Sequence, residues 1–242
     1  MKKKAIPILI PYTKKGLPLT ESKKKTPLYN VHVALGARIE DFHDFLMPIL
    51  YDSIISEHRN TRCNASLFDI SHMGEIVVEG EGATELIQKV ITNDVSCIQN
   101  HQALYTPICN EEGGILDDII VFKFFPEKYI LVVNCINTER DYEWIKKFKN
   151  NDTNIGNISE QIALLAVQGP KSQEIIRDAY GDKCATLPRF QFTGITHNRI
   201  DLTISRTGYT GEDGFEIFVN HLNCENVWNL LLEKGKHLGL KA

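Results

Sequence analysis

Two adjacent carboxylates stand at the start of an apolar, β-branched segment, directly after the pair Gly113 and Gly114. β-Branched apolar residues favour a strand, and a glycine pair favours a turn. Because side chains alternate along a strand, Asp118 is predicted to lie on the face that carries the strand's aromatic residues. Asp117 is predicted to lie on the opposite face.

The chemistry of this carboxylate pair has two interpretations. The aromatic residues on the predicted face of Asp118 are Phe122 and Phe124. A carboxylate beside them is costly to bury unless something binds it. The pair could cap the glycine turn, or it could supply a catalytic or ligand-binding acid, since perturbed carboxylates gather at functional sites. This segment alone leaves both possibilities open.

The composition is that of a globular chain with a sizeable core. The chain has 242 residues, of which 43% are hydrophobic and 24% charged, and a formal net charge of −4. A chain of this length commonly holds more than one domain. Mild acidity argues against a nucleic-acid binder that neutralises phosphates. No apolar run approaches the roughly 20 residues of a membrane helix, so neither nucleic acid nor membrane is an expected partner.

The cysteine pattern predicts free thiols. Six cysteines occur without any Cys-x-x-Cys pair, so zinc and redox motifs are unsupported and no metal site is predicted. Cys109 and Cys135 end apolar, strand-like runs. We expect all six thiols to be free, buried or partly buried, in a reducing compartment.

Residues 1–25 differ from the rest in being rich in lysine, with Glu21 as the first acid. Their apolar stretch is short and is interrupted by Pro7 and Pro11, which argues against a signal peptide. The absence of arginine in this segment weakens the case for a transit peptide. We predict a flexible basic extension.

From residue 26 onward, helix and strand patterns mix without a strict βαβ rhythm, which favours an α+β fold with antiparallel sheets and flanking helices. Strands are predicted at 103–108, 115–125, 129–135, 162–168, 200–206 and 214–219. Helices are predicted at 83–90, 138–149, 170–180 and 226–237. A capping box of Thr138 and Asp141 would open the second helix, and Pro170 would open the third at its first position.

Six motifs occur in a particular order. They are Thr-Pro-Leu-Tyr (26–29), Phe-Asp-Ile-Ser-His-Met-Gly-Glu (68–75), Gly-Gly-Ile-Leu-Asp-Asp (113–118), Val-Val-Asn (132–134), Val-Gln-Gly-Pro (167–170) and Ser-Arg-Thr-Gly-Tyr-Thr-Gly-Glu-Asp-Gly-Phe-Glu (205–216). Together they resemble the aminomethyltransferase (T-protein) family of the glycine cleavage system. Related folate-dependent dehydrogenase domains and folate-binding iron–sulfur assembly factors share parts of this pattern, and the full second motif favours the T-protein.

The resemblance implies a reaction without a metal. An aminomethyl group on the lipoamide arm of a lipoyl carrier (H) protein would release ammonia and pass its one-carbon unit to N5 of tetrahydrofolate. The protein would hold the pterin, orient N5 and manage protons. Such an enzyme would work in the cytoplasm of a bacterium or in the mitochondrial matrix of a eukaryote. The rival hypothesis is a non-catalytic folate-binding module, either a degenerate fragment or an assembly-factor relative.

The resemblance also implies roles for individual residues. Asp118 would be the catalytic acid, and Glu216 would accept hydrogen bonds from the guanidine-like edge of the pterin. Four more residues would line the folate cavity: Met73, Tyr105, Asn134 and Tyr209.

Each of these residues also has a structural interpretation. Glu216 alternates with apolar residues and would more often be solvated surface. Met73 could fill a core, Tyr105 could be an ordinary strand aromatic, and Asn134 could cap a strand end. The glycines beside Tyr209 would let the backbone approach a ligand. His72 is expected to be structural, and no catalysis is assigned to it.

The resemblance further implies a domain organisation. Residues 26–75 and 156–242 would form a discontinuous first domain, and residues 76–155 an inserted second domain. The family continues beyond residue 242 into an arginine-bearing helix and a C-terminal barrel, so the chain is expected to be C-terminally truncated with the barrel domain missing. Asp44-Phe45 stands where the family has Gly-Trp, and Phe122 where it often has Tyr.

Overall fold

The computed structural model describes residues 23–242, and most of the predicted basic extension lies outside them. The strands are β1 (Lys24–Lys25), β2 (Arg38–Phe42), β3 (Phe45–Leu50), β4 (Ala65–Asp69), β5 (Gly74–Glu79), β6 (Gln102–Cys109), β7 (Ile115–Phe125), β8 (Lys128–Val133), β9 (Asn154–Asn157), β10 (Ile162–Gln168), β11 (Phe192–His197), β12 (Ile200–Ser205), β13 (Gly214–Asn220) and β14 (Leu240–Lys241). The α-helices are α1 (Tyr29–Ala34), α2 (Ile54–Cys63), α3 (Ala83–Val90), α4 (Thr138–Lys146), α5 (Ser172–Tyr180), α6 (Asp182–Ala185) and α7 (Cys224–Gly235). Short 3₁₀ turns are η1 (Val95–Cys97), η2 (Cys135–Asn137), η3 (His221–Asn223) and η4 (Lys236–Leu238).

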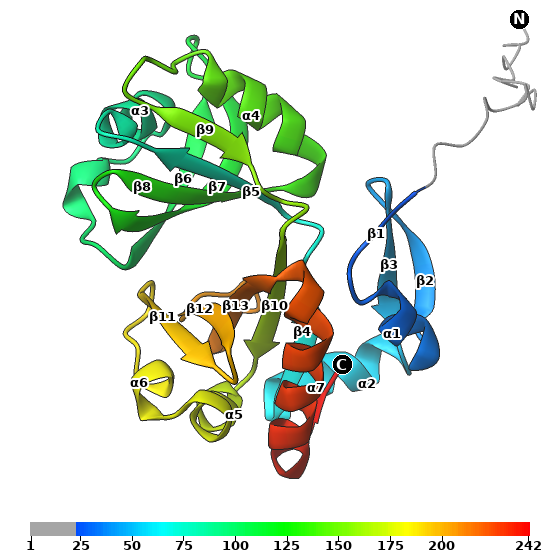
Figure 1. Cartoon of the computed structure of the whole chain (residues 1–242). Coiled ribbons are helices and arrows are strands. Elements are labelled where there is room, and N and C mark those ends of the chain that lie inside the picture. Colours follow the sequence, from blue (N-terminus) through cyan, green and yellow to red (C-terminus); the bar gives the residue numbers. More distant parts are fainter. Residues whose placement is uncertain (1–22) are drawn as a thin grey trace, which may run out of the picture.

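The strands form three sheets (Figure 1). A five-stranded sheet has the order β6-β7-β8-β5-β9, and a six-stranded sheet has the order β11-β12-β13-β10-β4-β14. A small sheet, β1-β3-β2, stands beside them. Neighbouring strands of the two large sheets are antiparallel except for β14 beside β4. The α+β prediction is therefore confirmed.

The strongest sequence patterns predicted their elements closely, with α3, β7 and β10 ending at the predicted residues. Helix ends were less accurate. The predicted capping box is wrong, because the hydroxyl of Thr138 donates to the carbonyls of Asn134 and Cys135 while Asp141 is buried. Helix α5 begins at Ser172, so Pro170 lies in the preceding turn rather than at the first helical position.

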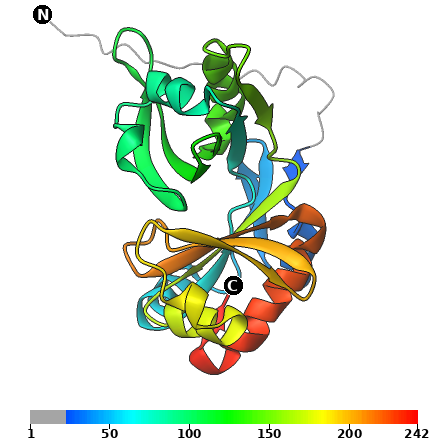
Figure 2. The same cartoon turned by 60° about the vertical axis from the view of Figure 1, so that its left-hand side comes forward.

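Two separate cores lie on the outer sides of the large sheets. Helices α5 and α7 cover one face of the six-stranded sheet, where Trp228 and Phe215 are among the buried residues. Helices α3 and α4 cover one face of the five-stranded sheet, where Ile87 and Ile145 are buried. Figure 2 shows the two sheets facing each other, with their helices on the outside.

A third apolar cluster joins the uncovered faces of the two sheets. Its buried members come from both sheets: Ala103, Phe122, Val132, Leu164, Phe192 and Phe218. The rings of Phe122 and Phe218 pack edge to face with centroids 5.0 Å apart, a favourable arrangement for aromatic pairs. We call this set the inter-sheet cluster. It holds the two sheet faces at a set separation and so positions whatever side chains flank it.

The hairpin between β2 and β3 explains the first departure from the family pattern. Asp44 has φ of 69°, a left-handed conformation that glycine adopts most readily and that aspartate tolerates better than most residues. Its backbone N–H donates to Asp41, and its carboxylate accepts from Lys23. These contacts hold the turn where the family has glycine.

The cysteines form no disulfide, although all six lie among residues 23–242. Cys184 and Cys224 are buried, as expected, but Cys63 and Cys97 are exposed, so the prediction of six buried or partly buried thiols is wrong for these two. Among the described residues, no helix combines the length and apolar character that crossing a membrane requires.

Candidate active site

The two adjacent carboxylates of β7 point in opposite directions, as alternation predicts. Asp117 is 4% exposed and faces the helix-covered core. Asp118 is exposed near the start of β7, on the face that carries Phe122 of the inter-sheet cluster. Neither caps the glycine turn, because Asn110 accepts from the N–H groups of Glu112 and Gly114. The turn-cap interpretation is therefore wrong.

Asp118 is held by two neighbours while remaining open to solvent. The hydroxyl of Tyr105 on β6 donates to Asp118 Oδ2 at 2.9 Å. The side-chain amide of Asn134 lies 3.4 Å from Asp118 Oδ1 and 3.1 Å from its carbonyl oxygen. The hydrogen bond to Asp118 raises the pKa of Tyr105, so the phenol keeps its proton. Asp118 is thus an oriented, accessible carboxylate, as a proton acceptor must be.

Asp117 has the structural role. It accepts from the backbone N–H of Asn134 at 3.0 Å and from its side-chain amide at 2.9 Å. The side-chain amide of Asn137 donates at 2.6 Å. A buried carboxylate needs such donors to offset its lost hydration. These bonds fix the segment after β8, where Asn134 reaches across to Asp118.

Glu216 lies on the facing sheet. Phe215 and Ile217 alternate with it and point into the helix-covered core. Glu216 therefore points toward the layer between the sheets, on the same side as Phe218. It is 8% exposed, so the solvated-surface interpretation is wrong.

The surroundings of Glu216 leave it able to accept further hydrogen bonds. Thr207 donates to Glu216 Oε2, and the hydroxyl of Thr207 also contacts that of Ser205 at 2.7 Å. Burial raises the pKa of Glu216, and the hydrogen bond from Thr207 opposes this shift. No donor among the described residues contacts Oε1. A planar ligand edge with two N–H donors would satisfy such a carboxyl.

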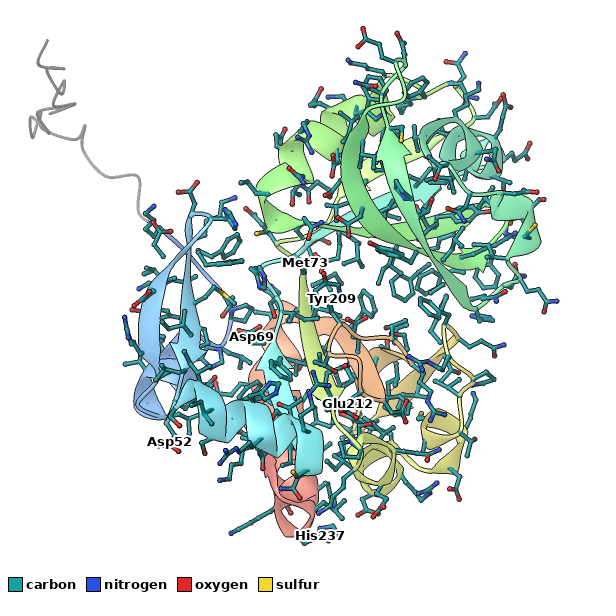
Figure 3. The ribbon with its side chains drawn as sticks, turned by 180° about the vertical axis from the view of Figure 1, so that it is seen from behind. Asp52, Asp69, Met73, Tyr209, Glu212 and His237 are labelled. Carbon is teal, nitrogen blue, oxygen red and sulfur yellow. The ribbon has the colours of Figure 1, made fainter. Side chains whose placement is uncertain are left out.

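The remaining two predicted residues flank this layer. Met73 is half-buried against the inter-sheet cluster. Tyr209 is 97% exposed on the loop between β12 and β13. Both lie near the junction of the five-stranded and six-stranded sheets (Figure 3). The structure thus brings Tyr105, Asn134 and Asp118 into contact and leaves Tyr209 projecting free.

Two glycines of the loop that carries Tyr209, Gly208 and Gly214, make room for a side chain of the protein itself. A Cβ on Gly208 would lie 2.0 Å from Oε1 of Gln168, and one on Gly214 would lie 2.2 Å from its Nε2. The Gln168 amide donates to the Thr207 carbonyl and accepts from the hydroxyl of Thr210. At Gly208 and Gly214 the loop is therefore built around Gln168. A Cβ on Gly211, the other glycine beside Tyr209, would meet only Arg62 Nη1, at 3.8 Å, so the expected approach of the backbone to a ligand stays a prediction.

His72 has a structural environment. It packs edge to face against Phe42 and Phe45, and burial lowers its pKa. Its Nδ1 has no hydrogen-bond partner among the described residues.

Sequence reasoning missed two residues of this region. Thr207, which donates to Glu216, was noted only as a member of the motif at residues 205–216. Asp141 was assigned to a helix cap, yet Ile145 stands one turn later and is buried on the same helix face. That i, i+4 spacing is the pattern that could have placed Asp141 in the interior. No group of three or more metal-binding side chains occurs within residues 23–242.

Known proteins resemble this chain in sequence and fold. The family described as "GCVT N-terminal domain" matches residues 28–242. An aminomethyltransferase of Halothermothrix orenii is 45% identical over 217 residues, which are 90% of this chain and 61% of that protein. One from Caldanaerobacter subterraneus is 43% identical over 94% of this chain and 61% of that protein. The chain therefore spans about 61% of the length of these relatives.

Solved structures resemble the fold as well. The crystal structure of glycine cleavage system aminomethyltransferase T from Bartonella henselae superimposes with a TM-score of 0.81 at 34% identity, covering 87% of this chain and 57% of that one. A heterotetrameric sarcosine oxidase from Corynebacterium has a TM-score of 0.59 at 10% identity, over 89% of this chain and 96% of that one, which shows a shared fold alone. The chain belongs to the GCVT N-terminal domain family.

Proposed function

We propose that this chain carries the folate-binding part of a glycine cleavage aminomethyltransferase. In the complete reaction, a methylene group would pass from the aminomethyl-lipoyl carrier (H) protein to tetrahydrofolate, and ammonia would be released. The observation that carries the proposal is the pair of acids on facing sheets: Asp118 oriented and accessible, and Glu216 buried with a free acceptor oxygen.

Tetrahydrofolate fits the chemistry of these side chains. Its pterin presents an amino group and a ring N–H on one edge, and a buried carboxylate such as Glu216 accepts from both. Its N5 supplies the nucleophile for the one-carbon unit. The aromatic and thioether side chains of Tyr105, Met73 and Tyr209 would contact the rings, and Asn134 would hold Asp118 toward them.

The protein's own chemistry would be orientation and proton management. Asp118 would accept or return a proton near the reacting nitrogen, while Tyr105 and Asn134 keep its carboxylate in one orientation. The inter-sheet cluster would exclude water from one side of the site. The enzyme would act where glycine cleavage operates, in the bacterial cytoplasm or the mitochondrial matrix.

We also propose that the two large sheets belong to two domains, with residues 76–155 inserted between 26–75 and 156–242. The five-stranded sheet, with all strands between Gly74 and Asn157, supports this division. Limited proteolysis tests it: early cleavage between the sheets would support the division, and early cleavage inside β7 or β8 would contradict it.

Tetrahydrofolate binding and carrier-dependent transfer test the function separately. Calorimetry should show binding to the wild-type chain and weak binding to Glu216→Gln, with exposed Glu111→Gln as the matched control. A methylene-transfer assay with a lipoyl carrier then distinguishes an enzyme from a non-catalytic folate-binding module, which would bind but not transfer. Absence of tetrahydrofolate binding to the wild type would refute both.

A further inference from the structure

A cleft lies between the two large sheets that face each other in Figure 2, away from the candidate active site. Its volume is about 550 Å³, a size that suits a small molecule. On β7 it is lined by Phe124, which stands six residues beyond Asp118, or roughly 20 Å along a strand. On β13 it is lined by Asn220, four residues beyond Glu216. Neither Asp118 nor Glu216 lines this cleft.

The two sides of the cleft are apolar and its opening is polar. Phe124 and Ile130 of the five-stranded sheet lie opposite Phe218 of the six-stranded sheet, and all three belong to the inter-sheet cluster or pack against it. The lining residues Thr196 and Asp201 are exposed. Aromatic rings pack well against a flat apolar body. A molecule in this cleft would therefore place such a body between the sheets and keep its polar substituents at the opening.

The cleft holds a buried acid at its inner end. Glu75 lines the cleft and is 1% exposed. Its neighbours Ile76 and Val78 belong to the helix-covered core, so Glu75 points the other way, toward the six-stranded sheet. Neither carboxyl oxygen has a hydrogen-bond partner among the described residues. Burial raises the pKa of Glu75 well above its usual range, and a buried carboxyl without donors is costly.

The protein groups around Glu75 leave this carboxyl unsatisfied. Lys128 also lines the cleft, but its ammonium group pairs with Glu79 at 2.7 Å. The backbone N–H of Glu75 donates to the hydroxyl of Ser159, and its carbonyl accepts from the N–H of Ile158. These bonds hold the backbone of Glu75 and leave its side chain without a donor. The missing hydrogen bonds are what a bound molecule would supply.

A glycine within β11 gives independent support. Gly194 lies on the same strand face as Phe192 of the inter-sheet cluster and lines the cleft. It pairs with Thr203 in an unbroken register, its φ is not positive, and a Cβ there would meet only the carbonyl oxygen of Leu202, at 4.0 Å. Neither backbone strain nor crowding thus requires glycine. Glycine weakens a strand and is typical of places where a ligand approaches the backbone closely.

We propose that this cleft binds a flat nitrogen compound whose amidine-type edge, an N–H donor beside a second nitrogen, pairs with Glu75 while its body lies between Phe124 and Phe218. Such an edge forms two parallel hydrogen bonds with a carboxyl group. The pair forms whichever partner holds the proton, so it suits an acid whose burial disfavours charge. Amidines and amino-heterocycles share this chemistry. The site is separate from the one proposed for tetrahydrofolate and does not depend on that function.

The probe is 2-aminobenzimidazole, which carries this edge on a flat body. Calorimetry with the full chain should show saturable binding with a dissociation constant of about 0.1–1 mM, the range for a fragment of about ten heavy atoms. The control compound, 2-methylbenzimidazole, has the same shape without the amino group and should bind about tenfold more weakly or worse. Absence of saturable binding of the probe, or equal affinity for both compounds, would overturn the proposal.

Replacing the acid tests its role without an activity assay. Glu75→Met removes the carboxyl group at similar volume and should weaken probe binding by about tenfold or more. It should also raise the melting temperature, because a buried acid without donors is lost. Glu127→Met, at an exposed acid that does not line the cleft, is the matched control and should leave probe binding unchanged. A lower melting temperature of Glu75→Met would show that Glu75 is structural and would overturn the proposal.

Two further variants locate the bound probe. Gly194→Leu fills the cleft without removing a polar group, so it should abolish probe binding at an unchanged melting temperature. Glu216→Gln should bind the probe as tightly as the wild type does. Loss of the probe in Glu216→Gln, with binding kept in Glu75→Met and Gly194→Leu, would place the probe at the candidate active site and overturn the proposal. If tetrahydrofolate fails to bind while Glu75→Met loses the probe, the proposed function fails and the second site stands.

Discussion

The two sheet faces that pack together through the inter-sheet cluster carry carboxyl groups of different kinds. On the five-stranded sheet, Asp118 is exposed and contacted by Tyr105 and Asn134. On the six-stranded sheet, Glu216 is buried and receives one hydrogen bond, from Thr207. The first suits proton exchange with substrate and solvent, and the second suits binding, because a buried acceptor gains most from a ligand that supplies the missing donors.

The largest expected effect tests whether Asp118, and not Asp117, takes part in the reaction. Asp118→Asn should lower methylene transfer by about 10²–10⁴-fold, the usual range for a positioned acid or base, with an unchanged melting temperature. Asp117→Asn should instead destabilise the fold by about 1–3 kcal/mol, because it presents an amide to three donors. Activity assays and thermal melts of both variants, with exposed Asp52→Asn as control, measure this. Equal activity losses in two equally stable variants would contradict the division of roles.

The second test concerns binding. Glu216→Gln should weaken tetrahydrofolate affinity by about 1.5–3 kcal/mol, roughly 10–100-fold, because hydrogen bonds to a charged acceptor are worth about that much. Once substrate saturates, turnover should change little. Calorimetry combined with kcat and KM measurements checks this. A loss confined to kcat would show that Glu216 takes part in the chemistry and would remove the contrast with Asp118.

The third test uses pH and stability. Burial raises the pKa of Asp141 to about 8 in the folded chain, well above the ordinary aspartate value of 3.8. Between these values the folded state holds one more proton than the unfolded state, so the free energy of unfolding should fall as pH rises, by up to about 1.4 kcal/mol per pH unit. Above pH 8 this contribution is constant. Urea unfolding at several pH values should show that Asp141→Asn removes this slope; an identical slope in both proteins would contradict the raised pKa of Asp141.

The smallest expected effect concerns Tyr105. Tyr105→Phe removes one donor to Asp118 but leaves the contact with Asn134. The activation free energy of methylene transfer should therefore rise by only about 0.5–1.5 kcal/mol. The control is Tyr142→Phe, on α4. Steady-state kinetics measure the difference. A loss as large as that of Asp118→Asn would mean that the phenol itself moves a proton.

Local patterns were enough for much of the fold. The glycine turn at residues 113–114 and the β-branched run that follows it predicted both ends of β7 correctly. Strand propensity and turn geometry act over a few neighbouring residues, so the local sequence was sufficient here. Helix starts were harder. The Thr138 and Asp141 spacing matched a capping box, but the packing of helix α4 buries Asp141 in the interior instead.

The sequence by itself determined which face of its strand each site residue occupies. A strand alternates with period two whatever surrounds it, so Asp118 had to oppose Asp117, and Glu216 had to oppose Phe215. Only the tertiary structure decided the environment of each. The burial of Glu216, the donors to Asp117 and the burial of Asp141 arise from the packing of strands and a helix that are far apart in sequence. Charge and hydration depend on those long-range neighbours, and local periodicity carries no information about them.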